Sequence, residues 1–134
     1  MYSVTKRIEF CYGHRLLHYE GQCKNLHGHN GRVEVDLETT ALDARGMVVD
    51  FADIKRGIKT WIDQTLDHRM LLHRDDPVVP ALRQGKELFY VMDENPTAEN
   101  ISKLIFRQLR IMGLHISRVS LWETPTGCAM YSEA

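Results

Sequence analysis

Two histidines, His27 and His29, stand two positions apart in the segment CKNLHGHN at residues 23–30. If this segment leads into a strand, both side chains lie on one face, with Cα atoms about 7 Å apart. A third imidazole, His14, stands at the end of the preceding predicted strand, where an antiparallel neighbour brings it alongside. Three neutral imidazoles with an open fourth position are the usual ligands of catalytic zinc. We therefore predict a zinc site at these three residues, the alternative being a chance pairing among seven histidines.

The remaining histidines offer weaker patterns. His18 follows His14 by four positions, and an HxxxH pair on a helix is also a metal motif. The residues around His14 do not begin a convincing helix, and the glutamate of an HExxH motif is absent from the pair. His73 and His115 are predicted to be surface or loop residues without a role.

A thiol lies four residues before the HGH segment. Cys23 could be a fourth zinc ligand, a nucleophile or base, or a buried small residue. Next to a bound metal it would be suited to removing a proton. Asp67 and His68 offer an orienting carboxylate and a relay imidazole, although neighbouring side chains normally point apart. Their cooperation depends on the turn that ends the preceding helix.

A carboxylate is predicted to face inward near the end of the chain. Glu123 alternates with Ser120, Trp122 and Thr124, so it shares a strand face with Val119 and Leu121. A buried acid needs a partner. The partner is either a salt bridge within the fold or a ligand edge with two N–H donors.

The elements that position these residues follow from periodicity. Alternation predicts strands over 4–10 and 33–38, then a turn at 43–46 and a short buried return strand at 47–49. A helical period follows over 51–66, where Asp50 is suited to cap the helix. A second helix is predicted from Thr97, its N-cap, to Met112. A hairpin over 119–131 ends the chain.

This order of elements favours an α+β fold, with a four-stranded antiparallel sheet and two helices on one face. Residues 71–95 hold the apolar run 88–92, which is either a short extra strand or a core-facing loop. We find no repeat or linker-like segment, so residues 1–134 are predicted to form a single domain.

Composition narrows the functional classes. The net charge is −1 and no basic block is present, so nothing favours nucleic-acid binding. No apolar run approaches the roughly 18–20 residues that cross a bilayer. Three cysteines without an export signal favour reduced thiols in the cytoplasm.

Taken together, the motifs resemble one family. FxxxH, CxxxHGHN, GMVVDF, LDH, NPTAEN, and ET with a tyrosine eight positions after the glutamate occur in the family's order. The chain thus resembles the 6-pyruvoyl-tetrahydropterin synthase family from about Phe10 to Tyr131. The three-residue gap between Cys23 and His27 resembles its carboxy-forming, queuosine-pathway branch.

The resemblance implies roles for individual residues. The three histidines match the zinc ligands, Cys23 the proton-abstracting thiol, and Asp67 with His68 its relay partners. Glu123 matches the acid that holds the amino-pyrimidine edge of the pterin and is linked to the proton relay. Thr97 and Glu99 match a segment near the pterin pocket.

The resemblance also implies an activity and an assembly. The activity is a zinc-dependent lyase reaction that converts 7,8-dihydroneopterin triphosphate to 6-carboxy-5,6,7,8-tetrahydropterin, with release of acetaldehyde and triphosphate. The fold is the tunnelling fold (T-fold), which closes a barrel from three subunits. Two barrels stack into a homohexamer with active sites between subunits. The alternatives are a 6-pyruvoyl-tetrahydropterin synthase, which stops after triphosphate elimination, and a non-catalytic zinc-binding assembly protein.

Two departures from the family pattern stand out. The family usually has small residues before the first ligand, where this chain has Cys11, Tyr12 and Gly13. Tyr12 is expected to alter the wall of the pocket. The segment 71–95 is longer than in compact relatives.

Overall fold

The structure is a computed structural model that describes residues 1–133; Ala134, the last residue of the predicted domain, lies outside them. The elements follow in the order β1 (Tyr2–His14), η1 (Gln22–Lys24), β2 (His27–Thr39), α1 (Phe51–Thr65), β3 (Arg69–His73), α2 (Val79–Gln84), β4 (Phe89–Met92), α3 (Ala98–Ile111), β5 (Ile116–Thr124) and β6 (Gly127–Tyr131). The α+β class is confirmed.

The sheet is larger than predicted. Its strand order is β4-β3-β1-β2-β5-β6. The four predicted antiparallel strands are β1, β2, β5 and β6, and they pair in that order. The short strands β3 and β4 extend the sheet beyond β1 in parallel pairings. The prediction of four strands was wrong because a parallel strand depends on a distant partner, which alternation over five residues does not reveal.

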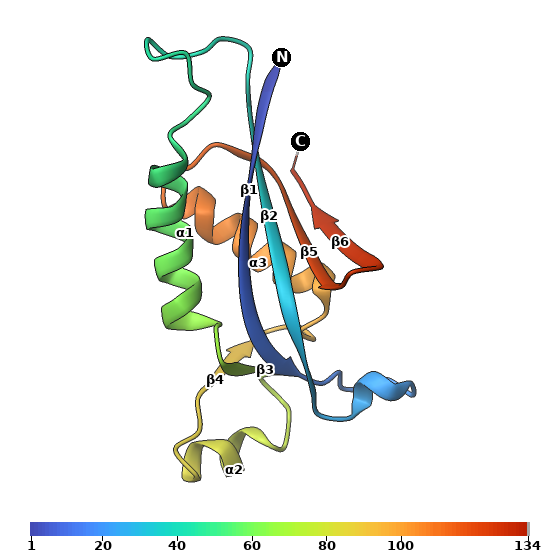
Figure 1. Ribbon diagram of the computed structural model, residues 1–134. Helices are drawn as coiled ribbons and strands as arrows, with labels where there is room; N and C mark the ends of the chain where they lie inside the picture. The colour runs from blue at the N-terminus through green and yellow to red at the C-terminus, as the bar shows by residue number, and fades with distance from the viewer. Residues whose placement is uncertain (134) are drawn as a thin grey trace.

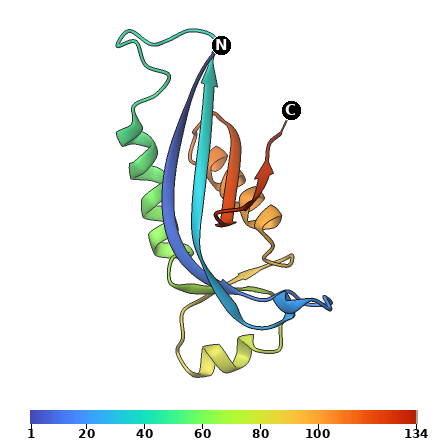
Figure 2. The same cartoon turned by 45° about the vertical axis from the view of Figure 1, so that its right-hand side comes forward.

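Both long helices lie on the same side of the bent β1–β2 ribbon, whereas α2 lies apart at the end where β3 and β4 run (Figures 1 and 2). Their caps are as predicted. The side chain of Asp50 accepts a hydrogen bond from the Ala52 amide, and that of Thr97 accepts one from the Asn100 amide. Such caps satisfy amide groups that the first helical turn leaves free.

The core lies between this helical layer and one face of the sheet. Alternate residues of β1 and β2, such as Ile8, Phe10, Val33 and Val35, are buried against the apolar faces of α1 and α3. The intervening residues of the ribbon face the other side. The ribbon therefore presents two chemically distinct faces.

Two of the predictions for residues 47–95 can be compared with the structure: the character of the run at 88–92 and the return strand at 47–49. The run at 88–92 contains a strand, β4, and the segment from β3 to β4 includes the helix α2. The predicted return strand at 47–49 does not form: Met47 is exposed, and only Val48 and Val49 pack partly against the core. The preceding turn does form, with Gly46 at a φ of 80°, which a glycine adopts without strain.

None of the helices within residues 1–133 is both long and apolar enough to cross a membrane.

Candidate metal centre and its surroundings

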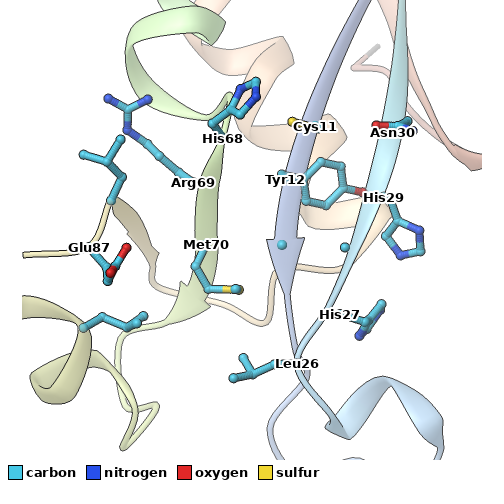
Figure 3. A pocket seen from close by; sticks show the side chains of 14 residues that line it. Cys11, Tyr12, Leu26, His27, His29, Asn30, His68, Arg69, Met70 and Glu87 are labelled. Carbon is cyan, nitrogen blue, oxygen red and sulfur yellow. The ribbon is translucent and has the colours of Figure 1, made fainter. Parts of the chain in front are cut away.

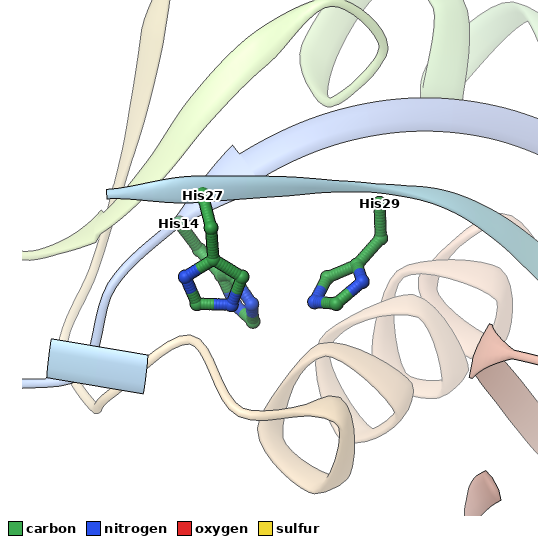
Figure 4. Close-up of side chains that lie close together, drawn as sticks. All are labelled: His14, His27 and His29. Atoms are coloured by element: carbon green, nitrogen blue, oxygen red, sulfur yellow. The ribbon is translucent and has the colours of Figure 1, made fainter. Parts of the chain in front are cut away.

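Three imidazoles converge where the β1–β2 ribbon ends. His14 is the register partner of His27, and His29 follows two positions along β2 on the same face. The ring centroids are 4.5 Å apart for His14 and His27, 5.1 Å for His14 and His29, and 5.0 Å for His27 and His29. One nitrogen of each ring lies within 4.8 Å of the other two. Figure 4 shows all three rings on the α3 side of the ribbon.

Backbone carbonyls orient two of these rings. His14 Nδ1 lies 2.6 Å from the carbonyl oxygen of Pro96, and His27 Nδ1 lies 2.7 Å from that of Asn25. A ring that donates from Nδ1 keeps Nε2 free as a ligand atom. Within residues 1–133, the buried Nε2 atoms of His14 and His29 have no hydrogen-bond partner. An all-nitrogen donor set with orphaned ligand atoms fits a divalent ion such as zinc.

The protonation state of His14 also fits metal binding. Burial lowers its pKa, and this effect outweighs the opposing influence of the Pro96 carbonyl and Glu123. The ring is therefore held neutral, as a metal ligand must be.

Glu123 lies beside the histidines, on the predicted inward face. Its side chain is one quarter exposed; Oε2 is 3.5 Å from His29 Nε2, and Oε1 is 3.9 Å from His14 Nε2. The pairing of β5 with β6 shifts between Trp122 and Thr124, so Glu123 is the extra residue of a β-bulge. Bulges re-aim side chains and are frequent near functional sites.

Glu123 has a partner inside the fold that the sequence did not identify. The Tyr12 hydroxyl donates a hydrogen bond to Glu123 Oε1 at 2.9 Å. Burial raises the pKa of Tyr12, and the neighbouring Glu123 charge and this hydrogen bond raise it further. Tyr12 therefore remains a protonated donor at neutral pH.

Asp67 and His68 contact each other directly, because the turn after α1 is unusual. His68 has a φ of 58°, and its Nδ1 lies 2.7 Å from Asp67 Oδ2. Burial acts to raise the pKa of Asp67, but hydrogen bonds from His68 and from the Cys11 amide outweigh it and hold the pKa below its usual range. The pair is an ionised carboxylate holding an imidazole, as a proton relay requires.

Among residues 1–133, the thiol grouped with this pair is that of Cys11. The ligand atoms of Cys11, Asp67 and His68 lie within 4.8 Å of one another. Cys23 sits in η1, partly buried, and belongs neither to this group nor to the histidine group among residues 1–133. The structure thus brings together the three histidines with Glu123, and separately Asp67 with His68, but among the described residues Cys23 joins neither group.

The NPTAEN segment contacts the histidine site through its backbone. Pro96, whose carbonyl meets His14, directly precedes Thr97. Thr97 Oγ1 accepts a hydrogen bond from the Asn100 amide at 3.1 Å, so the hydroxyl serves as the cap of α3. Glu99 is exposed in the first turn of that helix.

A pocket of about 680 Å³ opens where the ribbon meets β3 (Figure 3). Cys11, Gly13 and Asn30, which alternate with the core-facing residues, line it together with His68 and Glu87. Tyr12, His27 and His29 are also among the residues that line this pocket, so Cys11 and His68 border the same cavity as two of the three histidines.

Sequence reasoning missed three contacts of the site: the Tyr12 hydroxyl, the Pro96 carbonyl and the Cys11 thiol. One signal was available. Tyr12 lies two positions before His14 on a strand, so it had to share the face of the metal histidines.

Comparisons with known proteins agree with this architecture. The family model described as 6-pyruvoyl tetrahydropterin synthase matches residues 3–134. A curated 6-carboxy-5,6,7,8-tetrahydropterin synthase of Rickettsia felis is 38% identical over 133 residues, covering 93% of this chain and 96% of the relative. That of Haemophilus influenzae is 30% identical over 141 residues, covering 99% and 100%.

Solved structures give the same result. An uncharacterized protein of Wolinella succinogenes superimposes with a TM-score of 0.82 at 29% identity, covering 99% of this chain and 98% of the other. The 6-pyruvoyl tetrahydropterin synthase of Caenorhabditis elegans gives a TM-score of 0.74 at 26% identity, covering 99% and 96%. The chain belongs to the 6-pyruvoyl tetrahydropterin synthase family and has its T-fold. The curated relatives from Rickettsia felis and Haemophilus influenzae carry the name of the carboxy-forming enzyme.

Proposed function

We propose that the protein is a zinc-dependent lyase of queuosine biosynthesis. It would convert 7,8-dihydroneopterin triphosphate and one water molecule to 6-carboxy-5,6,7,8-tetrahydropterin, releasing acetaldehyde and triphosphate. The observation that carries the proposal is the convergence of His14, His27 and His29 beside the Glu123 carboxylate. The names of the curated relatives and the Cys23–His27 spacing support the carboxy-forming reaction.

The metal half of the proposal rests on the histidines. His14, His27 and His29 would hold the ion through their Nε2 atoms, with the Nδ1 atoms of His14 and His27 donating to backbone carbonyls. When bound, zinc supplies Lewis acidity to a side-chain hydroxyl of the pterin.

The proposed proton transfers to and from the substrate rest on ionisable side chains. Cys23, as a thiolate, would remove a carbon-bound proton made acidic by the conjugated ring, and His68, oriented by Asp67, would relay protons. No redox cofactor is required, since oxidation of the side chain balances reduction of the ring. Because Cys23 does not join the His68 group within residues 1–133 of one chain, the complete site would form between subunits of an oligomer, expected to be a hexamer.

Glu123 would select the pterin. The amino-pyrimidine edge presents an amino group and a ring N–H, which match the two oxygens of a carboxylate. One Glu123 oxygen already accepts from Tyr12, yet each carboxylate oxygen can accept a further hydrogen bond.

Product analysis tests the reaction. The zinc-loaded protein is incubated with 7,8-dihydroneopterin triphosphate, and the pterins, triphosphate and acetaldehyde are identified. Equal amounts of acetaldehyde and 6-carboxy-tetrahydropterin are expected. A 6-pyruvoyl product without acetaldehyde would assign the other branch, and an unchanged substrate would indicate a non-catalytic zinc protein.

A substitution at Glu123 tests the substrate class. Glu123→Gln replaces one acceptor with a donor that opposes the pterin N–H, while preserving the shape of the side chain. Loss of a buried charged partner costs about 2–5 kcal/mol, which is roughly 30-fold to several thousand-fold in affinity. We expect that loss in pterin binding with zinc content unchanged. The matched control is Glu133→Gln, at an exposed residue that pairs with Tyr131 and Arg107.

A further inference from the structure

The ring of Tyr12 is fixed among the residues of the candidate site. Tyr12 is the register partner of His29 and is only 3% exposed. Its ring stacks on Phe10 at a centroid distance of 5.1 Å and meets His14 edge-on at 5.3 Å. A Cβ at Gly31 would lie 2.8 Å from Tyr12 Cε1, so the ring fits because residue 31 has no side chain. The hydroxyl consequently has one well-defined position.

From that position the hydroxyl donates to Glu123 Oε1 at 2.9 Å. A hydrogen bond from a neutral donor to a carboxylate is stronger than one between two neutral groups. Within residues 1–133, Tyr12 supplies the one side-chain donor hydrogen-bonded to this carboxylate. The orientation of Glu123 therefore depends on Tyr12.

The Glu123 carboxylate lies close enough to the histidines to compete for the open coordination position of a bound metal. Its oxygens lie 3.5 Å from His29 Nε2 and 3.9 Å from His14 Nε2. In a tetrahedral zinc site with bonds of about 2.0–2.1 Å, ligand atoms stand about 3.3 Å apart. A small rotation would make the carboxylate the fourth ligand, and the attraction between an anion and a divalent cation favours that rotation. Glu123 would then be lost as an acceptor for a substrate edge.

We propose that Tyr12 is a positioning residue that holds Glu123 away from the open coordination position and in the orientation that accepts the substrate. The part that concerns the substrate rests on the proposed reaction, whereas the part that concerns the metal site rests only on binding of an ion by the three histidines. With the Tyr12 hydroxyl in place, the histidines bind the metal and the Glu123 carboxylate stays free to accept hydrogen bonds from the substrate.

The decisive variant is Tyr12→Phe, which keeps the ring and removes only the hydroxyl. Each protein is loaded with Co²⁺ in the absence of any pterin, and its visible ligand-field spectrum is recorded. We expect the spectrum of Tyr12→Phe to differ from that of the wild type, because the released carboxylate enters the coordination sphere. Adding Glu123→Gln to Tyr12→Phe should restore the spectrum of Glu123→Gln alone.

A matched control exists on another strand. The Tyr131 hydroxyl donates to Glu133 at 2.7 Å, so Tyr131→Phe removes a similar tyrosine–glutamate hydrogen bond that does not involve the histidine group. Its Co²⁺ spectrum should match the wild type. Identical spectra for Tyr12→Phe and the wild type would overturn the proposal.

Binding measurements separate this proposal from the proposed function. Pterin affinity should fall about tenfold in Tyr12→Phe, equivalent to loss of one orienting hydrogen bond. If Glu123→Gln abolishes pterin binding but Tyr12→Phe binds normally, the positioning role is overturned while the proposed function stands. If the wild type does not bind pterin, the proposed function fails, and the Co²⁺ spectra still decide whether Tyr12 restrains Glu123.

Discussion

His14 Nδ1 lies 2.6 Å from the carbonyl oxygen of Pro96, the residue immediately before the N-cap of α3. This contact joins a candidate metal ligand at the end of β1 to the start of a helix more than 80 positions later in the chain. Pro96 has no amide hydrogen, and its ring restricts the backbone that presents the carbonyl. The geometry of the candidate metal centre therefore depends on the stability of the first turn of α3.

Removing the cap of α3 should weaken metal binding as well as the fold. Thr97→Ala removes a side-chain acceptor for the Asn100 amide and should cost about 0.5–2 kcal/mol of unfolding free energy. We expect zinc affinity to fall as well, because the Pro96 carbonyl loses its fixed position. Urea denaturation and competitive zinc titration measure the two effects.

The control for this prediction is the other capped helix. Asp50→Ala removes the equivalent cap of α1, whose acceptor oxygen lies 2.9 Å from the Ala52 amide. It should lower stability to a similar extent and leave zinc affinity unchanged. Equal zinc affinities in the two variants would mean that the Pro96 contact does not tune the metal centre.

The three histidines should bind one zinc ion per chain. His27→Ala is expected to remove most of the zinc, measured by elemental analysis of the purified protein. Zinc should also raise the wild-type unfolding free energy by about 4 kcal/mol at a free concentration a thousand-fold above Kd. His115→Ala, at an exposed histidine outside the site, should behave like the wild type. Full zinc content in a variant with all three site histidines replaced by alanine would contradict the assignment.

The end of β1 should lose stability in acid. Arg15 Nε donates to Asp76 Oδ2 at 2.8 Å, and the Val78 amide donates to Oδ1 at 2.9 Å. The hydrogen bond from Arg15 is the main reason that the pKa of Asp76 lies below its usual range. A folded-state pKa below the unfolded value of about 3.9 means that the contribution is complete above that value and is lost as the pH falls through the folded pKa.

Asp76→Asn tests this contribution. The variant should be less stable than the wild type by about 1–3 kcal/mol at pH 7, and the difference should shrink below about pH 4. Urea denaturation across a pH series provides the comparison. Asp93→Asn, at a highly exposed carboxylate, is the control. A difference that stays constant down to pH 2 would show that Asp76 acts without its charge.

The separation of Cys23 from Asp67 and His68 predicts complementation between subunits. Cys23→Ala and His68→Ala should each retain zinc and lose turnover. Mixed oligomers of the two should recover about one quarter of the wild-type rate, because random mixing places an intact Cys23 beside an intact His68 in that fraction of sites. Light scattering should report a hexamer for both. No recovery in verified mixed oligomers would indicate that the relay acts within one chain, where Cys11 is the thiol beside it.

The elements that carry the candidate metal centre were predictable from sequence. The two-residue spacing of His27 and His29 before a predicted strand indicated that both share one face, and antiparallel pairing was expected to bring His14 alongside them. Asp50 and Thr97 marked both helix starts, since a side-chain oxygen before an apolar helical stripe satisfies free amides.

The remaining features depend on contacts between distant parts of the chain. The parallel pairing of β3 with β1 cannot be read from five residues, and the left-handed backbone of His68 comes from the way the chain leaves α1. The contact between Tyr12 and Glu123 joins residues 111 positions apart. Periodicity gives the face of each side chain but not its neighbour on another strand.

The bulge at Glu123 limits how the last hairpin can change in length. Hairpin tips normally tolerate insertions and deletions. Here the pairs Trp122–Cys128 and Thr124–Gly127 leave Glu123 as the residue without an opposite. Loss or gain of one residue between Trp122 and Gly127 would alter the register and turn a side chain to the other face of the sheet. The tip of this hairpin can therefore vary in composition. Its number of residues cannot change without turning the Glu123 side chain away from the histidines.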